Sequence, residues 1–295
     1  MKNIILILSL ILISGAIAFA LLALKFYRQR KVIHAQNQLI ESRDKMISSM
    51  NRAFNKQLLF IHHSVGDQWL NMAGLRMELM RHGLGVHDAT YGDFIGEQTD
   101  MNNWHLKFSR DMDKILKFHY HPDFYYDSPL ENDIIMFKSC FPNSQIIDEG
   151  TAPGNPDDAA KLVWNYKAVL ESLKYIFSKY PDKIFIFVTA PPLIQGQTTL
   201  ENAQRAREFN DWAKNIYHSE YKRDTGLDNL LVFDLFDILA DSTNCLKSEY
   251  KFKVGDSHPN TTGLAEATRQ FVRFLAANNV ISDDVVENAI PIAGD

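Results

Sequence analysis

The sequence predicts an α/β fold in which a five-stranded parallel sheet lies between two layers of helices. Short apolar runs alternate along the chain with longer segments whose apolar residues recur at helical spacing, a pattern typical of a parallel sheet covered on both faces. The chain has 295 residues, of which 46% are hydrophobic. Residues 56–280 are numerous enough for one such domain with a single core.

Five short apolar runs predict the strands, at Leu58–His62, Gly85–Ala89, Asp133–Phe137, Ile184–Thr189 and Leu230–Asp234. Four segments carry apolar residues every three or four positions and predict helices, over residues 69–80, 162–177, 203–217 and 264–275. Ligands of such sheets bind just beyond the carboxyl ends of the strands. Polar residues that directly follow a predicted strand are therefore the candidates for a functional site.

The amino terminus is uncharged and almost entirely apolar from Ile4 to Leu24. A helix of this length matches the hydrocarbon core of a bilayer, about 30 Å thick, so we expect residues 1–25 to form a transmembrane anchor. The alternative is a cleaved signal peptide, because Ala16 and Ala18 give the small-x-small form of a cleavage site. In either case this segment precedes the α/β domain and is not part of its core.

Two further segments flank the predicted domain. Residues 26–55 contain no proline or glycine and place apolar residues at roughly helical spacing, which predicts a helical stalk, either paired with another copy or solvated. Residues 281–295 form a carboxy-terminal tail.

Charge and cysteine content narrow the classes of partner only slightly. The formal net charge is −5, which gives no electrostatic reason to expect a nucleic-acid partner. The two cysteines, Cys140 and Cys245, are compatible with one disulfide or with two free thiols.

Ser64 is the first candidate for catalysis. It follows the first predicted strand directly, and a helix is expected to begin just after it. This position places the hydroxyl at the mouth of the sheet and the backbone N–H of Ser64 at a helix amino terminus, where negative charge is favoured. The alternative is that Ser64 only caps the helix, as serine often does.

Asp256 and His258 are the matching candidates near the end of the chain. They stand in Asp256-Ser257-His258-Pro259, between the last predicted strand and the closing helix. A histidine here could take the proton of Ser64, and the aspartate could fix the tautomer of the imidazole and stabilise the imidazolium. The alternative is a surface loop without a catalytic role.

The segments after the second and third strands offer candidate donors to an oxyanion. Asn143 follows Cys140-Phe141-Pro142, and its side-chain amide could donate to the oxyanion, although a Pro-Asn pair also favours a plain turn. Gly92 and Gly96 follow the second strand, and either could offer a backbone N–H that no Cβ obstructs.

The order of these residues along the strands resembles the SGNH (GDSL-like) hydrolase superfamily, over roughly residues 56–278. The resemblance implies a flavodoxin-like three-layer sandwich and an esterase, lipase or carbohydrate acetylesterase that needs no cofactor and no metal. It also implies a catalytic triad of Ser64, His258 and Asp256, with Asn143 and Gly96 in the oxyanion hole.

The individual blocks depart from the usual family pattern. The first block has His62-His63-Ser64 in place of Gly-Asp-Ser, and the third has Lys138 to Asn143 in place of Gly-x-Asn-Asp. Gly96-Glu97-Gln98-Thr99 is similar to the Gly-Asp-Thr of the second block. The final block is Asp-x-His-Pro, one residue shorter than the common form and similar to that of some polysaccharide O-acetyltransferases.

These observations predict a serine esterase acting on a small-molecule or carbohydrate ester, for example an O-acetyl group. Two alternatives stay open, namely an O-acyltransferase for polysaccharides and an inactive, membrane-anchored binding module on the same scaffold. Trp69, Tyr91 and Trp104 could form an aromatic platform for a sugar, although aromatic residues at such spacings usually belong to a core.

A metal hydrolase and a cysteine nucleophile are the weaker interpretations. His62 and His63 are neighbours in a strand, so their side chains face opposite sides and do not easily bind one metal ion. Cys140 as a nucleophile is less expected than a buried structural cysteine.

The membrane orientation follows from two opposing arguments. Lys25, Arg28, Arg30 and Lys31 follow the predicted span, and the positive-inside rule alone would leave the domain in the cytoplasm. An enzyme tethered by one amino-terminal span usually acts on the far side of the membrane, so we expect an extracytoplasmic catalytic domain.

Overall fold

The computed structural model describes Leu22, residues 25–34, 36–38 and 41–42, Phe54, and residues 56–119 and 130–282. Contacts divide the chain into two units, Met1–Ser49 and Met50–Asp295. The described residues of the first unit are helical. No helix within the described ranges combines the length and the apolar character needed to cross a membrane. Except for Leu22, the predicted span at residues 4–24 lies outside the described residues, as do residues 283–295 of the tail.

The second unit contains the predicted sheet. Its strands are β1 (Lys56–Ile61), β2 (Leu84–Ala89), β3 (Ile134–Lys138), β4 (Ile184–Val188) and β5 (Leu230–Phe233). All neighbouring strands are parallel, in the order β2-β1-β3-β4-β5, which is the flavodoxin-like order. The fold-class prediction for this unit is therefore confirmed, and the strand ends differ from the predicted ones by at most two residues.

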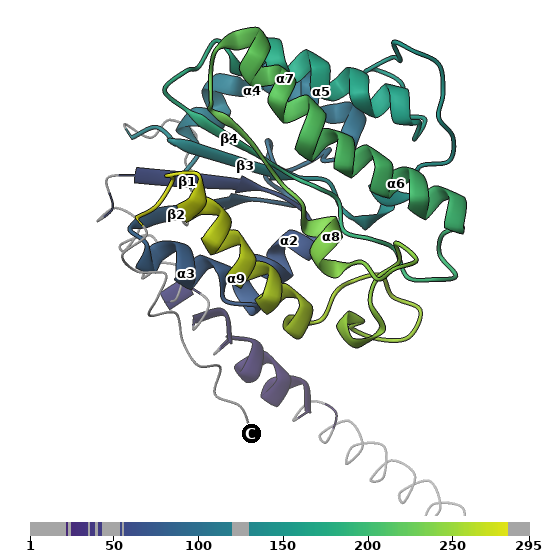
Figure 1. Ribbon diagram of the computed structural model, residues 1–295. Helices are drawn as coiled ribbons and strands as arrows, with labels where there is room; N and C mark the ends of the chain where they lie inside the picture. Colours follow the sequence, from purple (N-terminus) through teal and green to yellow (C-terminus); the bar gives the residue numbers. More distant parts are fainter. Residues whose placement is uncertain are drawn as a thin grey trace, which may run out of the picture. The chain divides into compact units, whose positions relative to one another are not determined.

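Helices cover both faces of the sheet (Figure 1). The described α-helices of this unit are α2 (Ser64–Asp67), α3 (Leu75–Arg81), α4 (Trp104–Lys117), α5 (Val163–Phe177), α6 (Leu200–Trp212), α7 (His218–Thr225), α8 (Leu235–Leu239) and α9 (Thr261–Ala277). Short π segments at Gln68–Met72 and Ala213–Tyr217 extend α2 and link α6 to α7. Single 3-10 turns lie at Met101–Asn103, Phe141–Ser144 and Ser248–Tyr250.

The alternation of side chains along each strand creates two separate cores. On β1, Leu59 and Ile61 pack with the apolar faces of α4, α5 and α6, whereas Leu58 and Phe60 pack with α2, α3 and α9. Because both of their faces are buried, β3, β4 and β5 are almost continuous apolar runs, whereas the edge strand β2 also contains His87 and Asp88. The carboxyl edge of this sheet positions the candidate site.

Helix α4 was not predicted from the sequence. Trp104, Phe108, Met112 and Ile115 are buried on one face of this helix at spacings of three and four residues, so the helical signal was present. Trp104 is core rather than a sugar platform, and so is Trp69, since both indoles are fully buried.

Candidate active site

The turn between β1 and α2 fixes the place of Ser64. β1 ends at Ile61 and α2 begins at Ser64 itself. The ring of His62 is fully buried against the turn, and a Cβ at Gly66 would lie 2.3 Å from the Cβ of His62. The missing side chain of Gly66 thus lets the chain turn tightly over His62, and Ser64 is left partly exposed at the edge of the sheet.

The side chains of Ser64, His258 and Asp256 form a chain of hydrogen bonds. Nε2 of His258 lies 2.9 Å from Oγ of Ser64, and Nδ1 lies 2.6 Å from Oδ1 of Asp256. A carboxylate can only accept, so the proton of the neutral imidazole belongs on Nδ1, and Nε2 is left as the acceptor for the serine hydroxyl. The structure therefore brings together the three residues that the sequence predicted as a triad.

The short Asp-x-His spacing is compatible with this geometry because one carboxylate oxygen serves two donors. Oδ1 of Asp256 also accepts the backbone N–H of His258, at 3.0 Å. This backbone hydrogen bond, followed by the one from the imidazole, lowers the pKa of Asp256. The carboxylate is thus ionised over the neutral range, as an acid that orients a catalytic histidine must be.

Packing on both sides holds the loop that carries His258. Phe252 donates its backbone N–H to the carbonyl oxygen of His258 at 3.1 Å, and Lys251 forms a bridge with Pro259. Ser257 is buried, and its hydroxyl accepts the backbone N–H of Ile194 at 3.0 Å. These contacts restrict the imidazole to one approach toward Ser64.

The segment after β3 forms the opposite wall. The Sγ atom of Cys140 lies 3.6 Å from Oγ of Ser64, and the ring of Phe141 meets the imidazole of His258 edge to face, with centroids 4.9 Å apart. Cys140 is partly exposed and Cys245 is buried, and both are free thiols. The sequence analysis left open whether the two cysteines form a disulfide, and the structure has none between them.

The backbone N–H of Gly96, which the sequence predicts as a donor in the oxyanion hole, is engaged within its own loop. This N–H donates to the carbonyl oxygen of Asp93 at 2.9 Å. The glycine is required for another reason, because a Cβ there would lie 2.0 Å from the carbonyl oxygen of Thr90. The backbone N–H of Gly92, the other candidate, donates to Oε1 of Glu97 at 2.7 Å.

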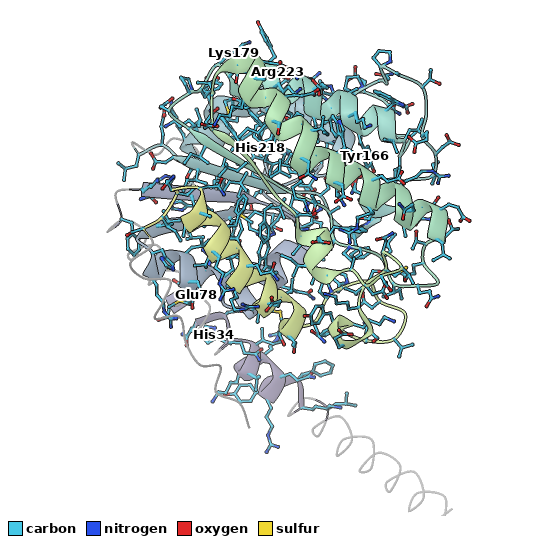
Figure 2. The ribbon with its side chains drawn as sticks, viewed as in Figure 1. His34, Glu78, Tyr166, Lys179, His218 and Arg223 are labelled. Carbon is cyan, nitrogen blue, oxygen red and sulfur yellow. The ribbon has the colours of Figure 1, made fainter. Side chains whose placement is uncertain are left out.

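Asn143 is likewise engaged in contacts within the loops. Its Nδ2 donates to Oδ1 of Asp100 at 2.7 Å and, more weakly, to the carbonyl oxygen of Cys140 at 3.4 Å. Its Oδ1 accepts the backbone N–H of Met101 at 3.0 Å, and the hydroxyl of Tyr166 lies 3.5 Å away. Tyr166 belongs to α5 and is labelled in Figure 2. Asn143 therefore ties the loop after β2 to the loop after β3, and its contacts give no support to the predicted role as an oxyanion donor.

His63 and Tyr91 form a stacked pair beside the nucleophile. Their ring centroids are 3.8 Å apart, and Tyr91 is 60% exposed. Nε2 of His63 lies 2.8 Å from the carbonyl oxygen of Gly96, and partial burial lowers the pKa of His63. A neutral imidazole donating to that carbonyl satisfies both observations. Of the three aromatic residues considered as a platform, only Tyr91 is exposed.

The contacts of His62, which directly follows β1, differ from those of a metal ligand. Nε2 of the buried His62 lies 3.7 Å from a carboxylate oxygen of Asp88, which Arg76 also contacts. The guanidinium of Arg76 and the contacts of His62 lower the pKa of Asp88 although its burial raises it. Within the described ranges, no three histidine, cysteine, aspartate or glutamate side chains are grouped so that they could hold a metal ion.

Comparisons with known proteins give structural neighbours only. No family model and no curated protein matches the chain. Similar solved structures include a GDSL-like lipase from Bacteroides thetaiotaomicron VPI-5482, at 11% identity and a TM-score of 0.43, with 79% of this chain and 97% of that chain covered. Another is a protein from Desulfitobacterium hafniense DCB-2 named as a lipolytic protein of the G-D-S-L family. It has 14% identity and a TM-score of 0.39, with 73% of this chain and 99% of that chain covered.

A third neighbour is the periplasmic domain of a lipopolysaccharide acetyltransferase from Salmonella ser. Paratyphi A, at 13% identity and a TM-score of 0.36, with 75% of this chain and 84% of that chain covered. Two of the three neighbours carry the GDSL name, the family that the sequence blocks resemble. Because these identities and scores are low, the fold assignment rests on the strand order of this chain, and the site rests on its own distances.

Proposed function

We propose that this chain is a serine esterase of the SGNH type, with Ser64 as nucleophile, His258 as general base and Asp256 as the acid that orients the imidazole. The observation that carries this proposal is the hydrogen-bond chain from Asp256 through His258 to Ser64, with distances of 2.6 and 2.9 Å. A surface loop without a catalytic role gives no reason for an imidazole to meet a serine 194 residues away in the chain.

In the proposed reaction, the hydroxyl oxygen of Ser64 attacks the ester carbonyl while Nε2 of His258 takes its proton. The carboxylate of Asp256 stabilises the imidazolium that forms. His258 then donates the proton to the leaving alcohol, and a water molecule activated by the same imidazole releases the acid and regenerates Ser64. The backbone N–H of Ser64 has no acceptor among the described residues and is a candidate donor to the tetrahedral oxyanion.

We further propose an O-acetylated carbohydrate as the substrate class. Tyr91 presents one ring face to His63, the residue before the nucleophile, and is 60% exposed. An exposed aromatic ring stacked on the residue before the nucleophile suits the apolar face of a sugar ring, which packs on aromatic rings. The acyl group would then lie toward Cys140 and Phe141, which form the other wall.

The first experiment asks whether Ser64 is activated. A fluorophosphonate probe should label the wild-type protein and fail to label Ser64→Ala, because only a serine paired with a general base reacts readily. Ser144→Ala provides the matched control, since the hydroxyl of Ser144 is buried and donates to the carbonyl oxygens of Ala190 and Pro191. A wild-type protein that the probe does not label would contradict the proposal and favour a binding module.

The second experiment identifies the substrate. Release of acetate from acetylated oligosaccharides should exceed release from long-chain acyl esters, and it should vanish in Ser64→Ala. Acetylated oligosaccharide formed from an acetyl donor, with little free acetate, would instead assign the chain as an acyltransferase.

A further inference from the structure

We infer that the oxyanion donor of this site includes the backbone N–H of Cys140, and that the buried ammonium of Lys138 strengthens this donor through the Ser139–Cys140 peptide group. The inference rests on the proposed esterase function and replaces the donors that the sequence suggested. In this proposal Cys140 contacts the reacting atoms, and Lys138 is a positioning residue that acts through the peptide group of Cys140.

Cys140 lies in the right place for this role. Its Sγ atom is 3.6 Å from Oγ of Ser64. Only the short cysteine side chain therefore separates its backbone from the attacking atom. The backbone N–H of Cys140 has no hydrogen-bond acceptor in the part of the chain that the structure describes. In contrast, the backbone N–H of Gly96 and the side-chain amide of Asn143 donate hydrogen bonds to other groups.

Lys138 is unusual because it is a lysine at 0% exposure for which no carboxylate partner is found among the described residues. It is the last residue of β3, and the titratable group that acts on its ammonium is the thiol of Cys140 rather than an aspartate or glutamate. A buried cation without a counter-ion is costly to fold. Burial lowers the pKa of this ammonium, and the nearby Cys140 opposes that shift.

One side-chain hydrogen bond, found among the described residues, connects Lys138 with the proposed donor. Nζ donates to the carbonyl oxygen of Ser139 at 3.1 Å, and that carbonyl belongs to the same peptide group as the N–H of Cys140. In a trans peptide the N–H lies opposite the C=O, and the only cis peptide bond among the described residues is Ala152-Pro153. The N–H of Cys140 is therefore directed away from the ammonium.

A cation bound to a peptide carbonyl polarises the whole group and makes its N–H a stronger donor, because hydrogen bonds in a chain reinforce one another at low local dielectric. The peptide is also fixed in place, since the hydroxyl of the fully buried Ser139 accepts the indole N–H of Trp104 at 2.8 Å. A rigid, polarised donor needs little reorganisation when the oxyanion forms. This role accounts for the cost of burying Lys138.

The decisive test compares Cys140→Pro with Cys140→Ala. Both variants lack the thiol, but only proline lacks the N–H, and the φ of −85° at Cys140 is close to the value that proline requires. We expect kcat for p-nitrophenyl acetate to be about 10²- to 10³-fold lower in Cys140→Pro than in Cys140→Ala, with similar KM. Equal kcat values in two folded variants would overturn the assignment of the donor.

A second pair of variants tests Lys138 and remains informative if proline prevents folding. Lys138→Met should lower kcat roughly ten-fold and weaken an aryl trifluoromethyl ketone, which forms an anionic adduct with Ser64, by a similar factor. Lys174→Met is the matched control, because that lysine is mostly buried on α5 but paired with Glu171 and Glu220, so it should affect Tm and not the inhibitor.

Wild-type kcat and inhibitor affinity in a folded Lys138→Met variant would overturn the role of Lys138. The controls separate this result from a failure of the proposed function. If the fluorophosphonate probe labels the wild-type protein and the Cys140 variants are equal, only the donor is wrong. If the wild-type protein is neither labelled nor active, the esterase proposal itself fails.

Discussion

The carboxyl edge of the sheet carries two groups of polar residues that use their hydrogen bonds in different ways. In the first group, the hydroxyl of Ser64 donates to His258 and His258 donates to Asp256, so the two hydrogen bonds form one chain. In the second group, on the loops after β2 and β3, Gly96 and Asn143 donate to neighbouring loop residues. The first arrangement ends at an atom that can react, whereas the second closes on itself.

This difference shows why residue type and order are not sufficient to assign a role. Ser64, Gly96, Asn143 and His258 all lie in the expected order, in segments that follow strands of the sheet, yet only Ser64 and His258 meet. An amide or a backbone N–H has few protons, and one hydrogen bond to a loop removes it from catalysis. The predictions below test whether the first group is catalytic and the second structural, beginning with the largest expected effect.

Replacement of His258 should have the largest effect. His258→Ala removes the proton acceptor of Ser64, so kcat should fall by about 10⁴- to 10⁶-fold while the fold is retained. Steady-state hydrolysis of p-nitrophenyl acetate and a thermal melt measure both quantities. His218→Ala, on helix α7 (Figure 2), is the control and should keep normal kcat. A folded His258→Ala variant with near-normal turnover would eliminate the triad.

Asp256→Asn should come next. The neutral asparagine cannot stabilise the imidazolium as the carboxylate does, and its amide can donate to Nδ1 and hold the imidazole in the wrong tautomer. We therefore expect kcat to fall by up to about 10⁴-fold. KM should change little, because the carboxylate contacts the histidine rather than the substrate. Full activity in this variant would mean that His258 is oriented by the loop alone.

The sequence predicted the parts of the structure that depend on burial and on side-chain chemistry. The apolar runs at Ile134–Lys138 and Ile184–Val188 are buried on both faces, so their signal was strong. The meeting of Ser64, His258 and Asp256 was also predictable, since a serine after the first strand and an Asp-x-His pair before the closing helix suggest few other functions. The order of the elements and the candidate nucleophile both follow from local features of the chain.

The donors to the oxyanion could not be predicted from the sequence, and the reason is physical. Which N–H is free depends on every acceptor that the loops bring near it, and these contacts arise only in the folded chain. Trp104 illustrates the same difficulty, because an aromatic residue after a strand fits a platform or a core equally well until helix α4 buries it. Lys138 gave no signal either, since a lysine at a strand end is ordinarily exposed.

The second group should respond to pH through Asp93, which anchors the loop after β2. Its side chain is buried, and burial raises its pKa to about 6. The unfolded carboxyl ionises near pH 3.9, so between about pH 4 and 6 the folded state holds the extra proton, and stability falls as pH rises. Asp93→Asn lacks this titration and should gain up to about 3 kcal/mol relative to wild type across that window.

Urea unfolding of both proteins at pH 4.5 and pH 7 measures this difference. A constant offset between them reflects only the substitution itself, whereas a pH-dependent gap reports the titration of Asp93. Parallel stability curves would show that Asp93 ionises normally in the folded protein.

Asn143→Ala distinguishes the structural interpretation from the catalytic one. Loss of the amide leaves the backbone N–H of Met101 without its acceptor in a buried site, so unfolding should become easier by about 1–3 kcal/mol. For an oxyanion donor, kcat would instead fall by about 10²- to 10³-fold with normal stability. Urea unfolding and steady-state kinetics on the same preparation decide between the two, and a pure kcat effect would restore Asn143 to the catalytic site.

The smallest expected effect concerns Tyr91 and the proposed carbohydrate. A sugar ring stacked on the exposed face of Tyr91 should contribute about 0.5–1.5 kcal/mol, so Tyr91→Ala should raise KM for an acetylated oligosaccharide roughly two- to ten-fold. Tyr91→Phe keeps the ring and should retain the normal KM. For p-nitrophenyl acetate, which has no sugar, both variants should match wild type, because Tyr91 contacts His63 and not the reacting atoms. Equal KM changes on both substrates would mean that the ring only supports His63, and the substrate class would then have to be inferred from the Cys140 and Phe141 wall.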